Sequence, residues 1–386
     1  MKKIYLDNGA TSFPKPKEVA DAVYEYMTDC GCNINRGGYQ AAYDVEGIVF
    51  ETRDMLREMF NAEDCKNVVF TKNITESLNI VLKGFLKSGD HVLTSSIEHN
   101  AVMRPLVQMQ KNGLEFDRIP ADESGVMDLS AVTSMIKPNT RAIVVTGASN
   151  VFGTINPIAE LGAICREHGL KFIVDSAQIA GALPIDMKEM SIDALCFTGH
   201  KGLLGPQGIG GFILKEDMIS LIDPLITGGT GSISHTEETP DFMPDKFEPG
   251  TMNIPGIVGL HQGLIWIRNR GLSNIYEHEL HLTQRFLDAL SPLAENGLLK
   301  IIGLPGTDGR TGVVSIQTLT KDCATAAFEL DNEYDIMTRV GLHCAPHAHK
   351  TFGTYPTGTI RFSFGNFNTE DEVDAAAAAL EAICRK

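Results

Sequence analysis

Residues 339–353, with the sequence RVGLHCAPHAHKTFG, concentrate side chains that can do chemistry. Cys344 stands there among three histidines, His343, His347 and His349. Thiol and imidazole groups together favour a metal site, whereas a cysteine with Gly, Pro and His neighbours also suits an exposed loop that presents a nucleophile. A structural zinc normally needs four well-placed ligands, so one cysteine with three loop histidines would make only a weak metal site, and the rest of the chain has to decide between the two interpretations.

A second candidate is Lys201, in DALCFTGHKGLLGPQGIGG. It follows a hydrophobic strand pattern and precedes a turn rich in glycine and proline, whereas an ordinary surface lysine stands on a helix or a polar loop. Partial desolvation in such a place lowers the pKa of the amine and makes it able to form a Schiff base. On this residue alone, a structural lysine is the alternative interpretation.

Asp175 follows another buried strand pattern, FIVDSAQ, 26 residues before Lys201. A carboxylate in this place can keep the pyridine nitrogen of pyridoxal phosphate protonated, which makes the ring an electron sink. A helix N-cap is the alternative role for this aspartate. Gln178, three residues further on, is able to donate a hydrogen bond to the phenolic oxygen of the same ring.

A phosphate site is expected where FTKNITESLNIVL passes from a strand through a turn into a helix. The helix is predicted to open at Thr75, Glu76 and Ser77, where free backbone amides and a hydroxyl form a cradle for an anion. The alternative is a capping threonine followed by an early acidic residue. Thr198 and His200, directly before the lysine, add two further candidate donors.

Short β-branched runs alternate with helical patterns between residues 66 and 214. The runs that predict strands are NVVF, HVLTSS, EFDRIP, RAIVVTGAS, KFIVDSAQ, ALCFTGHK and GIGGFIL. Apolar residues at 78, 81, 82 and 85 predict one buried helix face. Such alternation is typical of an α/β fold with a mostly parallel sheet covered on both faces, and the Gly-rich turn before the last strand predicts antiparallel pairing there.

Residues 226–256 are irregular, and a loop of this length is usually functional or disordered. A helical region through residue 290, the strand patterns GVVSIQTL and TIRFSFG, and the final Ala-rich helix EDEVDAAAAALEAIC follow it. These patterns predict a small α+β domain at the C-terminal end.

The net charge of −16, from 33 Lys and Arg against 49 Asp and Glu, offers no electrostatic surface for nucleic acid or anionic membrane. The N-terminal residues lack the apolar core of a signal peptide, so a cytoplasmic protein is expected. Most of the eight cysteines are expected to be buried, small apolar residues. Cys30 and Cys32 are too closely spaced for the Cys-x-x-Cys redox motif.

Over almost its full length the chain resembles the class V aminotransferases and, within them, the cysteine desulfurases. The motifs that carry this resemblance are YLDNGATSFPKP, TKNITESLN, SSIEHNA, ASNVFGTINPI, VDSAQ, TGHKGLLGPQGIG, FEPGTMN and RVGLHCAP with GTIRFSFG. The resemblance implies an aspartate-aminotransferase-like fold and a homodimer with its active sites at the interface. It implies an N-terminal segment (1–14) packing with the small domain, a large domain that binds pyridoxal 5′-phosphate (15–255), and a small C-terminal domain (256–386).

For the cofactor, the resemblance implies that Lys201 forms the Schiff base, that Asp175 and Gln178 contact the ring, and that His99 stacks on its face and acts as an acid and base. The remaining cofactor-binding residues that it implies are Thr75, Glu76, Thr198 and His200, with Thr251 reaching the phosphate in the neighbouring subunit.

For the substrate, the resemblance implies that Asn150 and Arg361 hold the carboxylate, and a guanidinium suits this because it binds a carboxylate through two parallel hydrogen bonds. Arg339 and Asn8 line the pocket. The implied reaction converts L-cysteine to L-alanine and leaves the sulfur on Cys344 as a persulfide. This chemistry needs the Cys344 thiolate, which nearby imidazoles and arginines would favour.

Alternatives to this function are a selenocysteine lyase, and an aminotransferase or C–S lyase in which Cys344 takes no part. The chain also departs from the family pattern, because Asn35 stands where relatives often have His. Since Arg361 follows Cys344 by only 17 positions, the cysteine loop is expected to be short and ordered, with His347 and His349 on its solvated face. The protein that accepts the sulfur is not indicated by any motif.

Overall fold

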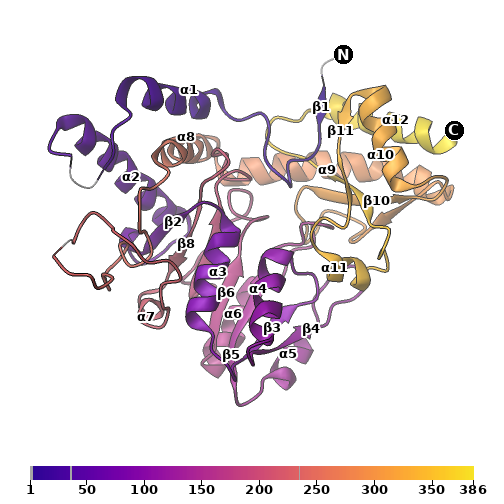
Figure 1. Ribbon diagram of the computed structural model, residues 1–386. Helices are drawn as coiled ribbons and strands as arrows, with labels where there is room; N and C mark the ends of the chain where they lie inside the picture. Colours follow the sequence, from indigo (N-terminus) through magenta and orange to yellow (C-terminus); the bar gives the residue numbers. More distant parts are fainter. Residues whose placement is uncertain (1–2, 35–36, 234) are drawn as a thin grey trace.

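A seven-stranded sheet forms the centre of the computed structural model, which describes residues 3–34, 37–233 and 235–386 (Figure 1). Its strand order is β2-β8-β7-β6-β5-β3-β4. The strands are β2 (Val68–Thr71), β3 (His91–Ser95), β4 (Glu115–Ile119), β5 (Thr140–Thr146), β6 (Lys171–Asp175), β7 (Ala194–Thr198) and β8 (Gly210–Leu214). All seven strands predicted from the sequence are thus confirmed.

Six of these strands run in one direction, and β8 runs against both of its neighbours, β7 and β2. The predicted antiparallel pairing of the last two strands is therefore correct. In the register of these strands, Gly210 lies opposite Thr198 of β7 and opposite Thr71 of β2. The carboxyl ends of β2 and β7 consequently lie at the same edge of the sheet.

Both faces of the sheet are covered by helices, and alternate residues of each strand point to opposite faces. In β7, Leu195 and Phe197 pack in one core cluster, while Ala194 and Cys196 pack in another. The first cluster includes buried residues of α2 (Gln40–Met59), α6 (Ile158–His168) and α8 (Ile254–Arg270). The second includes residues of α3 (Ile74–Phe85), α4 (Asn100–Gln110) and α7 (Glu216–Ile219). Smaller elements are α1 (Lys17–Glu25), η1 (Tyr26–Cys30), η2 (Cys65–Asn67) and α5 (Leu129–Met135).

The C-terminal part contains an antiparallel sheet of order β12-β13-β10-β9, which confirms the predicted α+β character. Its strands are β9 (Leu299–Ile302), β10 (Val313–Thr318), β12 (Arg339–Gly341) and β13 (Thr359–Ser363). A separate core cluster forms between this sheet and α9 (Leu272–Glu295), α10 (Cys323–Tyr334) and α12 (Glu370–Arg385). The short helix α11 (Pro346–Thr351) follows β12.

The N-terminal residues join this smaller sheet region, since β1 (Ile4–Tyr5) pairs with β11 (Ile336–Met337) and Asp7 bridges to Ser363 (Figure 1). Between α7 and α8 the described residues form neither helix nor strand, as the irregular sequence predicted. Among the described residues, no helix is long and apolar enough to cross a membrane.

Candidate active site

Lys201 and Asp175 lie at the carboxyl edge of the large sheet. Asp175 ends β6, and Lys201 follows the neighbouring strand β7, with which β6 pairs in parallel. Parallel strands end at a common edge, where open α/β sheets usually bind their ligands. Burial lowers the pKa of Lys201 to about 8, and the opposing attraction of the Asp175 carboxylate offsets part of this effect. The amine is therefore partly neutral near pH 7, as a Schiff-base lysine requires.

The turn that carries Lys201 is fixed by close backbone contacts. A Cβ atom on Gly202 would lie 2.4 Å from the carbonyl oxygen of Ala180, so only glycine fits beside the lysine. Ser12 donates a hydrogen bond to the Lys201 carbonyl oxygen at 2.9 Å. The N-terminal segment thus helps to hold the lysine at the sheet edge.

Asp175 is 2% exposed, and its carboxylate accepts a hydrogen bond from the backbone N–H of Ala177 at 2.9 Å. Burial raises the pKa of this carboxyl group, while the Ala177 hydrogen bond and the charge of Lys201 oppose the rise. Gln178 donates from its side chain to the Gly9 carbonyl oxygen at 3.1 Å. Its amide therefore faces the N-terminal segment.

His99 is the N-cap of α4, and its Nδ1 accepts a hydrogen bond from the N–H of Ala101 at 3.0 Å. Burial, together with the charges of Lys201 and three arginines, lowers the pKa of His99 to about 4. The imidazole is consequently neutral at pH 7 and carries its proton on Nε2. Glu98, a buried carboxyl group that the sequence analysis did not single out, accepts the N–H of Thr146 and braces this turn against β5.

Two buried polar atoms at the end of β7 have no hydrogen-bond partner in the described chain: Thr198 Oγ1 and His200 Nδ1. Buried groups of this kind are normally paired, so both atoms mark a place for a polar ligand. Burial also lowers the pKa of His200 to about 4, which leaves its imidazole neutral. Both residues were predicted as phosphate donors.

The helix predicted to open at Thr75 begins at Ile74, with Asn73 as its cap. The Asn73 side chain accepts the Glu76 N–H at 3.0 Å, and the Glu76 carboxylate accepts the Lys72 N–H at 2.7 Å. The capping arrangement considered as the alternative is thus present, although the capping residue is Asn73. Thr251 lines a hollow of about 280 Å³ together with Lys72 and Glu76.

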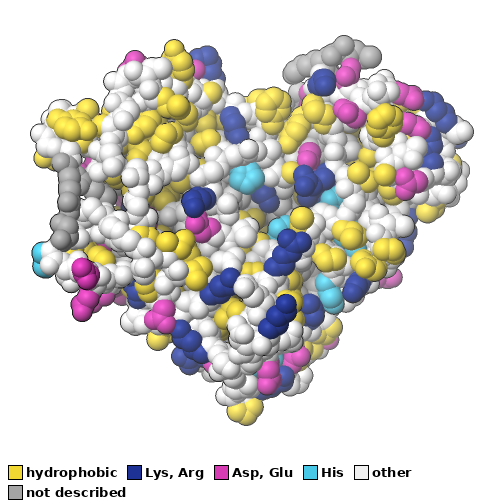
Figure 2. Space-filling model, in the orientation of Figure 1, with side chains coloured by type: hydrophobic (Ala, Val, Ile, Leu, Met, Phe, Trp, Pro, Cys, Tyr) yellow, Lys and Arg dark blue, Asp and Glu magenta, His cyan; other side chains and the backbone are white. Residues whose placement is uncertain are grey.

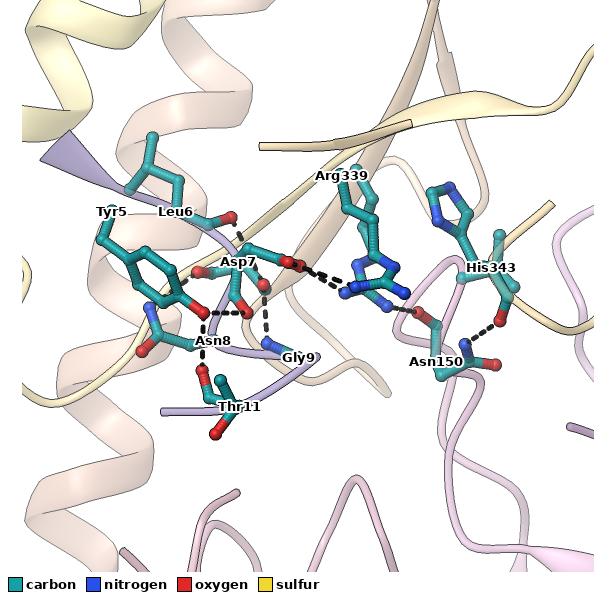
Figure 3. Close-up of polar contacts among 12 residues, drawn as sticks. Tyr5, Leu6, Asp7, Asn8, Gly9, Thr11, Asn150, Arg339 and His343 are labelled. Atoms are coloured by element: carbon teal, nitrogen blue, oxygen red, sulfur yellow. Dashed lines mark hydrogen bonds and ion pairs between the residues drawn. The ribbon is translucent and has the colours of Figure 1, made fainter. Parts of the chain in front are cut away.

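Arg361, on β13, points from the small sheet toward the large one. It is 2% exposed and donates to the backbone oxygen of Asn150 at 2.9 Å. Its second contact is with Asp7, at 2.6 Å, while Arg339 on β12 approaches the other oxygen of Asp7 at 3.5 Å (Figure 3). Arg361 Nε is buried and has no partner among the residues described. Two arginines that were predicted to meet the substrate therefore converge on one carboxylate.

Asp7 is the main residue that sequence reasoning missed. The only available signal was its position beside Asn8 in YLDNGA, because its partner Arg361 lies 354 residues away. Asn8, which was predicted to line the pocket, donates to the Ser363 carbonyl oxygen and to Asn368, each at 3.0 Å. Its side chain anchors the N-terminal segment to the end of β13.

Cys344 is exposed, and it lies in a loop between β12 and α11. His343 and Cys344 both adopt positive φ angles, +48° and +59°, which non-glycine residues rarely do. The Asn150 side chain donates to the His343 carbonyl oxygen at 2.7 Å, and the Asn100 N–H donates to the Cys344 carbonyl oxygen at 2.8 Å. The loop is therefore held against the elements that carry residues predicted to contact the substrate and the ring, with Asn150 and His343 side by side in Figure 3.

The three histidines of the cysteine segment contact other groups. His343 shares a hydrogen bond with Thr359, His347 with the Ser96 carbonyl oxygen, and His349 with Thr354. No group of three or more His, Cys, Asp or Glu side chains within the described ranges is placed to hold a metal ion.

The prediction that His347 and His349 form a solvated loop face is wrong for His349, which is fully buried, and His347 is half-buried. The packing of α11 against Phe152 accounts for this burial. Burial lowers the pKa of His349 to about 4 and that of His343 to about 2, so both rings are neutral at pH 7. They supply no positive charge beside Cys344, contrary to expectation. The departure at Asn35 lies outside the described residues.

Comparisons with known proteins indicate the same family over nearly the whole chain. The family model described as aminotransferase class-V matches residues 4–376. A probable cysteine desulfurase of Methanothermobacter thermautotrophicus is 32% identical across 98% of this chain and 94% of that protein. A cysteine desulfurase of Escherichia coli O157:H7 is 31% identical across 99% of this chain and 93% of that protein. The solved apo structure of a cysteine desulfurase from Thermococcus onnurineus NA1 superposes with a TM-score of 0.93 at 33% identity, covering 100% of this chain and 95% of that one.

Proposed function

This chain belongs to the class-V aminotransferase family and, within it, to the cysteine desulfurases, and on that premise we propose that it converts L-cysteine to L-alanine with pyridoxal 5′-phosphate. In this proposal the sulfur passes to Cys344 as a persulfide. The observation that carries it is the exposed Cys344 thiol, in a loop tied by hydrogen bonds to Asn100 and Asn150 beside the Lys201 site.

The residues at the sheet edge fit the cofactor. Thr198 Oγ1 and His200 Nδ1, which have no partner in the part of the chain that the structure describes, would hold the phosphate together with the start of α3 at Thr75 and Glu76. Thr251 of a second subunit would complete the cradle. Asp175 would pair with the ring nitrogen, Gln178 with the phenolic oxygen, and His99 would stack on the ring. When bound, the cofactor withdraws electrons from the substrate α-carbon and makes its proton acidic.

The substrate carboxylate would bind Arg361 and Asn150, with Arg339 at the exposed side. Asp7 already holds one guanidinium nitrogen of Arg361, and Arg361 Nε has no partner among the described residues. Asp7 would thus orient the guanidinium, while Nε and the exposed Arg339 receive the incoming carboxylate. A buried guanidinium that is already oriented loses less entropy on binding.

Proton transfers at three atoms, namely the α-carbon, the β-carbon and the thiol, and one sulfur transfer follow from these positions. The Lys201 amine would take the α-proton, since burial brings the pKa of this lysine to about 8. The Cys344 thiolate would attack the substrate sulfur, so that an S–S bond forms and the C–S bond breaks. The substrate β-carbon then takes a proton and becomes the methyl group of alanine, and the α-carbon regains a proton from the Lys201 ammonium group. His99, neutral and protonated on Nε2, is placed to exchange the thiol proton.

A homodimer with shared active sites is part of the proposal. Exposed apolar side chains on α2 and on the long loop support it, because contiguous exposed apolar surface marks association sites. These elements lie on the left of Figure 1. On the same side of Figure 2, which has the same orientation, hydrophobic side chains (yellow) gather. The residues are Tyr43, Phe50, Leu225, Ile226 and Phe242. Light scattering is expected to give twice the chain mass in solution.

A selenocysteine lyase is the second candidate, since a selenol ionises more readily than a thiol and such a substrate depends less on Cys344. Alanine and sulfide release from L-cysteine tests both functions, for wild type and Cys344→Ala, with L-selenocysteine in parallel. Turnover of cysteine by the wild type alone supports the desulfurase. Selenocysteine turnover by both proteins, with no reaction on cysteine, would show a lyase instead. Formation of an α-keto acid would indicate an aminotransferase. A cytoplasmic location and a sulfur-accepting protein partner belong to the same proposal.

A further inference from the structure

Cys30 and Cys32, which are separated by one residue in the sequence, form a close pair of thiols. Their sulfur atoms lie 3.5 Å apart. Cys30 ends η1, and the intervening Gly31 takes a left-handed φ of +56°, with its N–H donating to the Tyr26 carbonyl oxygen at 2.7 Å. This reversal of the chain at glycine turns both cysteine side chains toward one another. The spacing that excludes a Cys-x-x-Cys motif therefore does not keep the sulfurs apart.

The two thiols differ in access to solvent. Cys30 is exposed, whereas Cys32 is 8% exposed and its thiol donates to the Ala41 carbonyl oxygen at 3.3 Å. The Tyr26 hydroxyl donates to the Cys32 carbonyl oxygen at 2.7 Å and fixes the recessed residue. Burial and the adjacent Cys30 thiol raise the pKa of Cys32. An exposed thiol beside a recessed one is the arrangement of an attacking cysteine with its resolving partner.

We propose that Cys30 and Cys32 form a second sulfur site, a dithiol that takes sulfane sulfur from a persulfide and releases it as hydrogen sulfide. The site goes beyond the proposed function, because it needs a persulfide from any source and uses neither Lys201 nor Cys344.

The reaction has two steps. The Cys30 thiolate attacks the outer sulfur of a persulfide R–S–SH, so that this S–S bond breaks, R–SH leaves and Cys30 carries the persulfide. The Cys32 thiolate then attacks the inner sulfur, which closes the Cys30–Cys32 disulfide and expels hydrosulfide. In total, one persulfide and two thiols give one thiol, one disulfide and one hydrogen sulfide. The sulfane sulfur is reduced and the two cysteines are oxidised.

An external thiol would reset the site, since disulfides with an exposed sulfur are the more easily reduced ones. The sulfur could come from a small-molecule persulfide or from the persulfide proposed at Cys344. Both sources share the same reactive S–S–H group.

The test uses full-length, cofactor-loaded Cys344→Ala, reduced and freed of small thiols, and then mixed with glutathione persulfide. Hydrogen sulfide is expected in a ratio of one per chain, and the tryptic peptide of residues 18–36 should lose two hydrogens. Adding Cys32→Ser should trap one extra sulfur on Cys30 without sulfide release. Adding Cys30→Ser should abolish both the sulfide release and the loss of two hydrogens from the peptide. Adding Cys65→Ser is the matched control and should change neither of these two signals.

Retention of both thiols in the peptide, or unchanged sulfide release from the variant with Cys30→Ser, would overturn the proposal. So would disulfide formation with glutathione disulfide but not with the persulfide, because the site would then be a general redox pair. Disulfide formation in wild type during turnover of L-cysteine, absent in Cys344→Ala, would identify the protein's own persulfide as a source. Since the first arm supplies the persulfide directly, it succeeds or fails independently of desulfurase activity.

Discussion

The two reactive side chains are held in different ways. Lys201 is fixed by the register of adjacent strands and by backbone contacts that admit only glycine beside it. Cys344 is exposed, in a loop with two successive left-handed residues, and backbone hydrogen bonds to other elements hold it. Left-handed non-glycine residues cost of order 1–3 kcal/mol each, so the surrounding contacts must maintain the loop.

The difference follows from the chemistry proposed for each group. Proton transfer at a bound ring requires a fixed amine in a water-poor site, and a regular sheet edge supplies that rigidity. A sulfur acceptor must reach the substrate and afterwards meet a partner, so its thiol must stay accessible. Arg361 joins the two regions, since it extends from the small sheet to the backbone of Asn150.

The largest effect is expected for Lys201→Ala. Loss of the Schiff-base amine and proton acceptor should lower alanine formation by at least about 10³-fold, within the range of general acid–base catalysis. The absorbance band of the covalently held cofactor should disappear from purified protein. Lys188 is exposed, and Lys188→Ala serves as the control that should retain both alanine formation and the absorbance band. A Lys201→Ala protein that keeps its turnover would contradict the role of the sheet edge.

Arg361→Lys should raise KM for L-cysteine by about 10- to 100-fold, because a charge-assisted hydrogen bond contributes roughly 1.5–3 kcal/mol. Arg339→Lys is the matched variant, and it should raise KM only a few-fold because Arg339 is exposed and solvent weakens its interactions. Steady-state kinetics on both proteins measures the difference. Equal effects would mean that burial does not distinguish the two arginines.

The pH dependence of cofactor capture tests the buried amine itself. In cofactor-free protein the rate of reaction with pyridoxal phosphate should rise about tenfold per pH unit up to about pH 8 and then level off, because only the neutral amine reacts. Stopped-flow absorbance follows the reaction. A rate that continues to rise toward pH 10 would indicate a lysine with an ordinary pKa.

The smallest effect concerns stability at the Cys344 loop. Burial lowers the pKa of His349 to about 4 in the folded protein from 6.5, so above pH 6.5 the ring is neutral in both states. Below pH 6.5 the unfolded chain binds a proton that the folded protein does not. His349 should therefore lower the free energy of unfolding by about 1 kcal/mol for each unit that the pH falls.

Urea unfolding of wild type and His349→Gln at about pH 7.5 and pH 5 measures this contribution. The variant should lose less stability on acidification than wild type does. The exposed His168→Gln is the control and should keep the wild-type dependence. If His349→Gln lost as much stability on acidification as wild type does, protonation of the buried His349 ring would not account for the pH dependence of stability.

The sequence by itself determined the strands and the positions of the groups proposed to react. Strand and helix periodicity depends on neighbouring residues, and Lys201 and Asp175 stand directly after apolar runs, so the sheet and its reactive edge were predictable. Cys344 was identified from its local motif, and its exposure was expected from the Gly and Pro beside it.

Only the tertiary structure decided the contacts between distant segments. Local pattern did not indicate that Asp7 would meet Arg361, that the turn at Gly31 would bring two thiols together, or that α11 would bury His349. Each of these depends on how one element packs against another, or on a single backbone angle. Periodicity specifies which face of an element is apolar, but not which polar groups will meet when those faces pack.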